Sequence, residues 1–285
     1  RIAEGKAVAE LGEIPQIIGT LDENSAKLAS DVFKKITKII HFTDPLSAEL
    51  AKLYCNIYRY IDFAIGNEFM MIAEDYGCDI YEVLNLVNND YKRAGLKAPG
   101  LTAGPCLVKD GFFLIDKSPY MELVTAAWRL NENIPGYLLS KIKSEIKSLH
   151  KKHVAILGLA FKKNIDDIRY SLSPKMQRYF SAEGADVSVS DPYIDSKPIE
   201  DALKGANVLV IGINHDVYKN LDFDYLKKFV SEDCLICDIW NIFGTAKIIF
   251  YLKDVVGKME DRIRPNGEVR PYVKKRKVER IRLGI

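Results

Sequence analysis

The chain has 285 residues, 48% of them hydrophobic, which is enough for sizeable cores and favours two domains. Its 41 basic and 39 acidic residues leave a net charge of +2, so bulk charge indicates neither a nucleic-acid nor a membrane partner. No apolar run approaches the ~20 residues of a membrane span. Five scattered cysteines favour a reducing cytosol over a disulfide framework, so we predict a cytoplasmic protein.

Residues 1–43 predict the end of a nucleotide-binding domain. The stretch opens with RIAEGKAVAEL, which is typical of the interior of a longer protein. A short apolar strand (IPQIIGT), a helix that starts near Asn24 or Ser25 (DENSAKLASDVFKKI) and a second strand (KIIHF) follow. We expect a β-α-β unit that is too small to stand alone.

Residues 44–149 predict a helical domain built on one long helix. The pattern from Ser47 to Tyr76 contains no proline, is interrupted only by Gly66 and ends at Gly77, a typical helix C-cap. Its apolar residues surround most of the helix, as expected for a central helix or a subunit interface. Further helical patterns flank a glycine-rich loop, at 79–89 and 121–152.

Residues 150–285 predict a Rossmann-like domain with a doubly wound parallel sheet. Apolar strands (HVAILGLAF, VSVSDPY, NVLVIGI and CLICDI) alternate with helical or polar segments. A basic tail ends the chain (VRPYVKKRKVERIRLGI), and we expect it to be solvated rather than a binding arm.

The turn after the first of these strands departs from a dinucleotide fingerprint. That fingerprint needs three glycines, whereas only Gly158 is present, so we expect no NAD pyrophosphate cradle here. Lys162 and Lys163 follow the turn. They either hold another phosphorylated ligand by charge or are simply solvated, and the residues alone leave both readings open.

Two further sets of residues suggest chemistry. Lys52 and Asn56 lie four apart and share one helix face, either as part of an interhelical ion pair or as part of a site. Cys106 lies on the glycine loop with Lys109 and Asp110 close by. A lysine nearby can favour the thiolate and make it a nucleophile, but unpaired cysteines also serve as packing residues.

We predict no metal site. Cys234 and Cys237 form a C-x-x-C inside an apolar strand, without the second pair that zinc requires, so we interpret them as core residues on opposite sheet faces. The four histidines show no metal-binding spacing.

Four ordered motifs resemble the nucleotide-sugar 6-dehydrogenase family, of the UDP-glucose and UDP-N-acetyl-hexosamine type: RIAEGKA, AELAKLYCNIYR, PGLTAGPCLVKD and GLAFKKNIDDIRYS. The resemblance implies the last β-α-β of an NAD-binding domain, a helical central domain that forms a homodimer through its long helix, and a UDP-binding domain. It also implies that the glycine fingerprint for NAD lies upstream of Arg1, so we expect these 285 residues alone not to turn over.

The resemblance also implies roles for individual residues. The implied reaction oxidises the C6 alcohol of a UDP-sugar to the uronate with NAD, through a thiohemiacetal and a thioester on the cysteine. The implied catalytic residues are Cys106, Lys52, Asn56 and Asp110. Substrate contacts fall on Glu4, Arg93, Phe161 and Lys162, with Arg93 reaching an adjacent subunit, and NAD contacts fall on Lys109 and Arg169.

Two departures from the family pattern matter. Trp240 stands where many relatives carry a substrate-binding arginine, and the carboxylate that activates water falls just before Arg1, which leaves only its neighbour Glu4. The alternatives are a GDP-mannose 6-dehydrogenase and a non-catalytic nucleotide-sugar-binding module.

Overall fold

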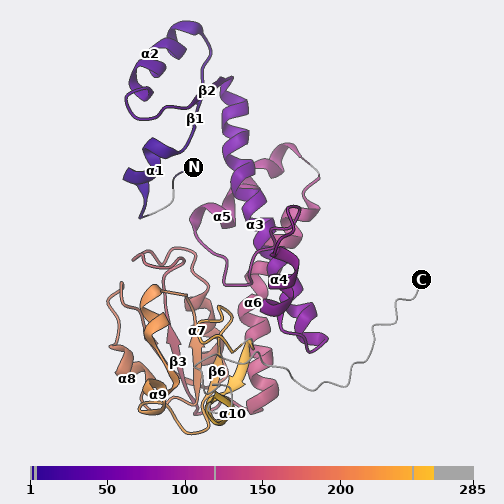
Figure 1. The fold of residues 1–285 in the computed structure, drawn as a ribbon, viewed down its shortest axis with the longest axis vertical. Helices are drawn as coiled ribbons and strands as arrows, with labels where there is room; N and C mark the ends of the chain where they lie inside the picture. The colour runs from indigo at the N-terminus through magenta and orange to yellow at the C-terminus, as the bar shows by residue number, and fades with distance from the viewer. Residues whose placement is uncertain (1, 3–4, 119, 246, 260–285) are drawn as a thin grey trace, which may run out of the picture.

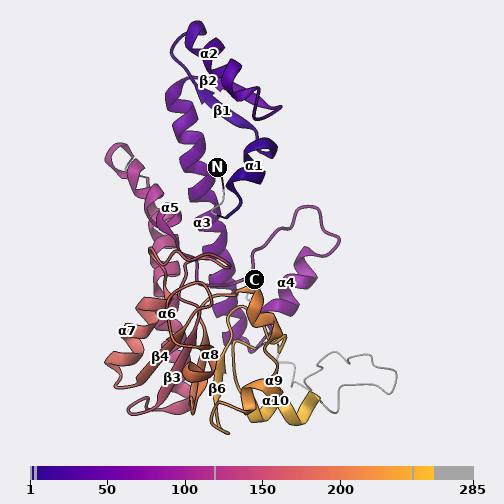
Figure 2. The same ribbon diagram turned by 90° about the vertical axis from the view of Figure 1, so that its left-hand side faces the viewer.

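The computed structural model describes residues 2, 5–118, 120–245 and 247–259. A long helix, α3 (Pro45–Asp75), connects a small N-terminal unit at one end of the molecule to the C-terminal sheet domain near the other (Figures 1 and 2). Helix α6 (Glu122–Ile146) packs along α3 and separates it from that sheet domain.

The N-terminal unit contains the predicted strand, helix and strand. Its elements are α1 (Ala7–Glu13), β1 (Gln16–Gly19), α2 (Glu23–Phe33) and β2 (Ile40–Thr43), and the two strands pair in parallel. Helix α2 begins after Asp22, whose carboxylate accepts a hydrogen bond from the Ser25 N–H. Helix α1 was not predicted, and none of its residues is buried, so no apolar periodicity marks it in the sequence.

The helical part is built around α3 as expected. Pro45 occupies the first turn and the Asp44 carboxylate accepts from the Ser47 N–H, so the helix starts two residues earlier than predicted. Gly66 does not interrupt the helix. The remaining elements here are α4 (Ile80–Asn88), α5 (Pro105–Lys109) and the 3-10 helix η1 (Asp110–Lys117).

The C-terminal domain is a five-stranded sheet in the order β4-β3-β5-β6-β7. The strands are β3 (His153–Leu157), β4 (Asp186–Ser190), β5 (Val208–Ile211), β6 (Leu235–Cys237) and β7 (Ile249–Tyr251). The first four are parallel, as predicted, but β7 pairs antiparallel to β6. The prediction of a parallel sheet was therefore incomplete at this edge, where a three-residue strand gives no usable pattern.

Helices cover both faces of this sheet, as a doubly wound domain requires. The connecting elements are α7 (Ser173–Ala182), α8 (Ile199–Leu203), η2 (Asp216–Asn220), α9 (Phe223–Lys227) and α10 (Leu252–Met259). One apolar cluster joins the sheet to α6 and α7, and a second joins it to α8 and α9. Cys237 belongs to the first cluster and Cys234 to the second, which confirms the prediction that they are core residues on opposite faces.

Across residues 2–118, 120–245 and 247–259, apart from the uncertain positions 3 and 4, no helix combines the length and apolar character needed to cross a bilayer. The basic tail, on which we made a prediction, lies outside the described residues.

Candidate active site

Three of the four predicted catalytic residues are in contact, because Lys52 and Asn56 both bind the Asp110 carboxylate. Asn56 Nδ2 donates to Asp110 Oδ2 at 2.7 Å, and Lys52 Nζ forms an ion pair with the same oxygen. The Asp110 side chain is 5% exposed, whereas that of Lys52 is 45% exposed. The buried carboxylate thus has its counter-charge, and the lysine still reaches solvent.

Cys106 lies one helical turn before Asp110. It is the second residue of α5 and is exposed, and the Asp110 N–H donates to its carbonyl oxygen. Both α5 and η1 pack on α3. Cys106 therefore lies one turn before the residue whose carboxylate contacts Lys52 and Asn56.

The C-terminal domain reaches this loop through Phe161. Gly104 has φ +107°, a conformation that favours glycine, and a Cβ there would lie 2.7 Å from the Phe161 ring. Phe161 thus packs on the backbone two residues before Cys106. The site is built from α3, the loop before α5 and the carboxyl edge of the sheet, which is where ligands bind in such folds.

A buried pair supports the loop that carries Phe161. Asp191 Oδ2 accepts from the Leu159 N–H at 2.6 Å, the Ala160 N–H at 3.1 Å and His215 Nε2 at 3.0 Å. The Asn164 N–H donates to His215 Nδ1 at 2.9 Å, which places the imidazole proton on the nitrogen that faces Asp191. Burial alone raises the pKa of Asp191, but the hydrogen bond from His215 and the backbone N–H groups outweigh it and leave this pKa lowered.

The two lysines after Phe161 differ in their surroundings. Lys163 Nζ forms an ion pair with Asp216 at 3.2 Å, so its charge is partly neutralised. Lys162 is half-buried beside Phe161 at the sheet edge. Lys162 directly follows Phe161 and is the less exposed of the two, which makes it the residue that we associate with an anionic ligand.

The remaining predicted residues are more scattered. Arg169 is exposed and forms an ion pair with Asp167 at 2.6 Å, and Lys109 is exposed at the end of α5. Arg93 lies over the Tyr91 ring on the loop after α4, which projects from α3 on the side away from α5 (Figure 2). The structure therefore does not bring Arg93 to Cys106 within one chain. Glu4 lies outside the described residues.

Sequence reasoning missed a buried amide pair behind the site. Asn67 Nδ2 donates to Asn131 Oδ1 at 2.9 Å, and Asn67 Oδ1 accepts from the Gly100 N–H at 2.9 Å. Asn131 Nδ2 donates to the Tyr60 carbonyl at 3.1 Å. These bonds fix the glycine loop to α3 and α6. The one available signal was polar residues at core positions of two helical patterns.

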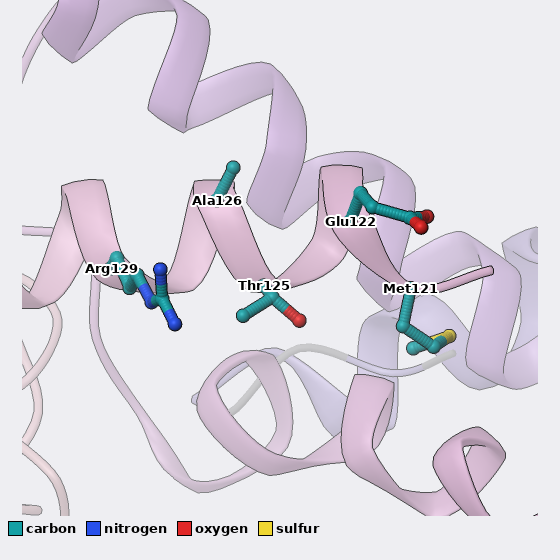
Figure 3. A pocket seen from close by; sticks show the side chains of 5 residues that line it. All are labelled: Met121, Glu122, Thr125, Ala126 and Arg129. Atoms are coloured by element: carbon teal, nitrogen blue, oxygen red, sulfur yellow. The ribbon is translucent and has the colours of Figure 1, made fainter. Parts of the chain in front are cut away.

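A surface depression runs along the first turns of α6 (Figure 3). Its lining residues are Met121, Glu122, Thr125, Ala126 and Arg129. None of the residues discussed above lines it, so we assign it no part in this site. Among the described residues, no group of three His, Cys, Asp or Glu side chains is arranged to hold a metal ion.

The two larger parts of the chain match one family. Residues 46–134 match the central domain and residues 155–245 the UDP-binding domain of the UDP-glucose/GDP-mannose dehydrogenase family. Both matches fall on the parts that form the site, and together they cover more than half of the chain. The chain belongs to the UDP-glucose/GDP-mannose dehydrogenase family.

The chain is similar to several individual members of this family. The chain is 35% identical over 253 residues to a UDP-N-acetyl-D-mannosamine dehydrogenase of Methanocaldococcus jannaschii, with 86% of this chain and 59% of that protein covered. Its fold is similar to the UDP-D-ManNAc dehydrogenase of Pyrococcus horikoshii, with a TM-score of 0.75, 30% identity and 81% and 57% of the two chains covered. It is also similar to a UDP-glucose dehydrogenase of Pyrobaculum islandicum, with a TM-score of 0.72 and 28% sequence identity. That match covers 78% of this chain and 56% of the other. The chain thus spans about 59% of the length of the first of these relatives.

Proposed function

We propose that this chain is the catalytic and UDP-binding part of an NAD-dependent UDP-sugar 6-dehydrogenase, which acts on a UDP-N-acetyl-hexosamine or on UDP-glucose. The observation that carries the proposal is the convergence of Lys52 and Asn56 on Asp110, one helical turn after the exposed Cys106. The names of two relatives described above favour an N-acetyl-hexosamine over glucose as the sugar. We keep the division at 1–43, 44–149 and 150–285, and the cytoplasmic location, as part of this proposal.

The roles of the residues follow from their chemistry. The Cys106 thiolate adds to the C6 aldehyde, so that an S–C bond forms and the carbonyl oxygen becomes the hydroxyl of a thiohemiacetal. Lys52 and Asn56 donate to that oxygen while it carries negative charge. Once the centre is a thioester, water attacks the acyl carbon, the C–S bond breaks, and Asp110 takes the proton from the water.

The oxidations need a hydride acceptor, for which we propose NAD. The described residues do not fit that coenzyme: β1 and β2 lack a glycine fingerprint, and the turn after β3 has only Gly158. For the same reason we expect the 285 residues alone to bind UDP without reducing NAD.

We also propose a homodimer through α3. Five exposed apolar side chains on this helix and at its end fall within about 60° of one another at 100° per residue: Tyr54, Tyr58, Phe69, Ile72 and Tyr76. Such a stripe is typical of a surface that another chain covers. It lies on the opposite side of the helix from Lys52 and Asn56, so a partner there leaves the site open.

Calorimetric titration of the 285-residue chain with UDP and with GDP tests the proposal. We expect UDP to bind at least about tenfold more tightly than GDP, a difference of about 1.4 kcal/mol. Tighter binding of GDP would favour a GDP-mannose 6-dehydrogenase instead. Binding of neither nucleotide would contradict the proposed function.

A further inference from the structure

Trp240 connects the carboxyl edge of the C-terminal sheet to the cysteine loop, which we define as residues 98–106. It follows β6 by three residues and is half-buried. Its indole N–H donates to the Gly212 carbonyl at 3.2 Å, just past the end of β5. A Cβ at Gly100 would lie 2.5 Å from Cζ3 and 2.7 Å from Cη2 of the same ring. One side chain therefore contacts both domains.

The backbone beside Trp240 is also held on the helical domain. The Tyr81 hydroxyl, from α4, donates to the Ile239 carbonyl. Asp238 Oδ2 accepts from the Phe243 N–H at 2.9 Å and closes the turn from the other side. The indole is thus fixed in place before it meets the cysteine loop, and it can resist movement of that loop.

The cysteine loop is held on its far side as well. Asn67 Oδ1 accepts from the Gly100 N–H, and the Asn67 side chain is completely buried. Gly100 therefore lies between a fixed amide and a fixed indole, six residues before Cys106. Movement of the sheet edge relative to α3 must displace this residue.

We propose that Trp240 is a positioning residue that clamps the cysteine loop to the nucleotide-binding edge of the sheet and couples occupation of that edge to the placement of Cys106. The coupling rests on the proposed function, because it requires UDP at the sheet edge. The clamp itself does not, because its contacts join residues of this chain to one another.

The clamp is tested by trypsin cleavage of the Lys97–Ala98 bond, followed by mass spectrometry, in the 285-residue chain without nucleotide. The variants are Trp240→Ala, Gly100→Ala and the double variant, with Trp128→Phe as the tryptophan control. Each single variant should raise the cleavage rate about tenfold, since local opening limits cleavage. The double variant should stay near that value rather than reach the product of the two single effects, because the three atoms nearest to a methyl group at position 100 all belong to the indole. Gly100→Ala keeps the test decisive if Trp240→Ala does not fold.

Different outcomes test the clamp, its coupling to UDP and the proposed function. A wild-type cleavage rate in the folded single variants, or multiplicative effects in the double variant, would overturn the clamp. UDP should slow cleavage at this bond in the wild-type chain but not in Trp240→Ala at saturating UDP, and equal slowing in both would overturn the coupling. If UDP does not bind the wild-type chain, the proposed function and the coupling both fail, and the nucleotide-free cleavage rates still decide whether Trp240 clamps the loop.

Discussion

Asn56 Nδ2 lies 2.7 Å from Asp110 Oδ2, although the two residues are 54 positions apart in the chain. The bond ties the centre of the site to the middle of α3 and leaves the carboxylate with two donors on one oxygen, Asn56 and Lys52.

Asp110→Asn should impair catalysis more than folding. The amide keeps the shape and an acceptor but cannot take a proton from water, so turnover should fall about 10²–10⁴-fold in an enzyme that joins this chain to an NAD-binding domain. The free energy of unfolding should fall by about 1–3 kcal/mol, because Lys52 loses its counter-charge but still reaches solvent. Initial rates of NADH formation and urea denaturation measure the two effects. Unchanged turnover would remove Asp110 from the mechanism.

Cys106 should react with iodoacetamide in the native chain far faster than the two core cysteines. Cys106 is exposed, whereas burial raises the pKa of Cys234 to about 12 and raises that of Cys237 as well. Peptide mass spectrometry after labelling at about pH 8, near the ordinary pKa of a free thiol, should find modification at Cys106 and neither of these two. A Cys106 as inert as Cys234 would favour the non-catalytic nucleotide-sugar-binding module.

Lys162→Ala should weaken UDP binding by about tenfold or more, because a half-buried cation at the sheet edge is lost. Lys163→Ala is the matched control, since its charge is directed to Asp216, and it should change the dissociation constant less than about twofold. Calorimetric titration at two salt concentrations measures both variants. Equal losses in the two would mean that general positive charge, rather than Lys162, attracts the nucleotide.

The contributions of two buried carboxylates, Asp191 and Asp238, to folding stability should change with pH in opposite directions. The pKa of Asp191 is lowered by its hydrogen bonds, so its contribution to stability is present above its ordinary value of 3.8 and is lost as pH falls through the lowered value. Burial raises the pKa of Asp238, so stability falls as pH rises from 3.8 through that higher value. The melting temperature of the wild type minus that of Asp191→Asn should therefore decrease as the pH falls below about 4. The melting temperature of the wild type minus that of Asp238→Asn should instead increase as the pH falls toward about 4 from above, and should change little below that. The same sign for both would contradict the assigned protonation.

Tyr58→Glu should convert the proposed dimer to monomer without loss of UDP binding. A charge in the apolar stripe would be buried without a partner at the interface, which costs several kcal/mol. Glu145, exposed near the end of α6 and outside the stripe, provides the control variant Glu145→Gln. Sedimentation velocity distinguishes the two states, and a monomeric wild type would refute the dimer.

Local patterns predicted the large elements well. The thirty-residue run without proline predicted α3, and four apolar runs predicted the parallel strands, because burial on both faces leaves a continuous signal. Helix α5 and strand β7 have five and three residues, too few for a period, and their tertiary contacts determine them.

The site was partly predictable for the same reason. Lys52 and Asn56 share a helix face by spacing, but spacing does not reveal that Asp110 lies against them. Trp240 stands out as a departure from the family pattern, yet its contact with Gly100 depends on how two domains dock. Asn67 gives almost no signal, since a buried amide resembles a surface one until its partners are known.

Gly66 interrupts the helical pattern in the sequence, but in the structure it lies inside α3 where the loop before Cys106 approaches the helix. A Cβ at this position would overlap the carbonyl oxygen of Lys97, so the helix and the incoming loop touch backbone to backbone. Every other amino acid would push the loop outward, beginning at Ala98 and continuing toward Cys106. For anyone redesigning this protein, the smallest residue of its longest helix is therefore one that has no substitute.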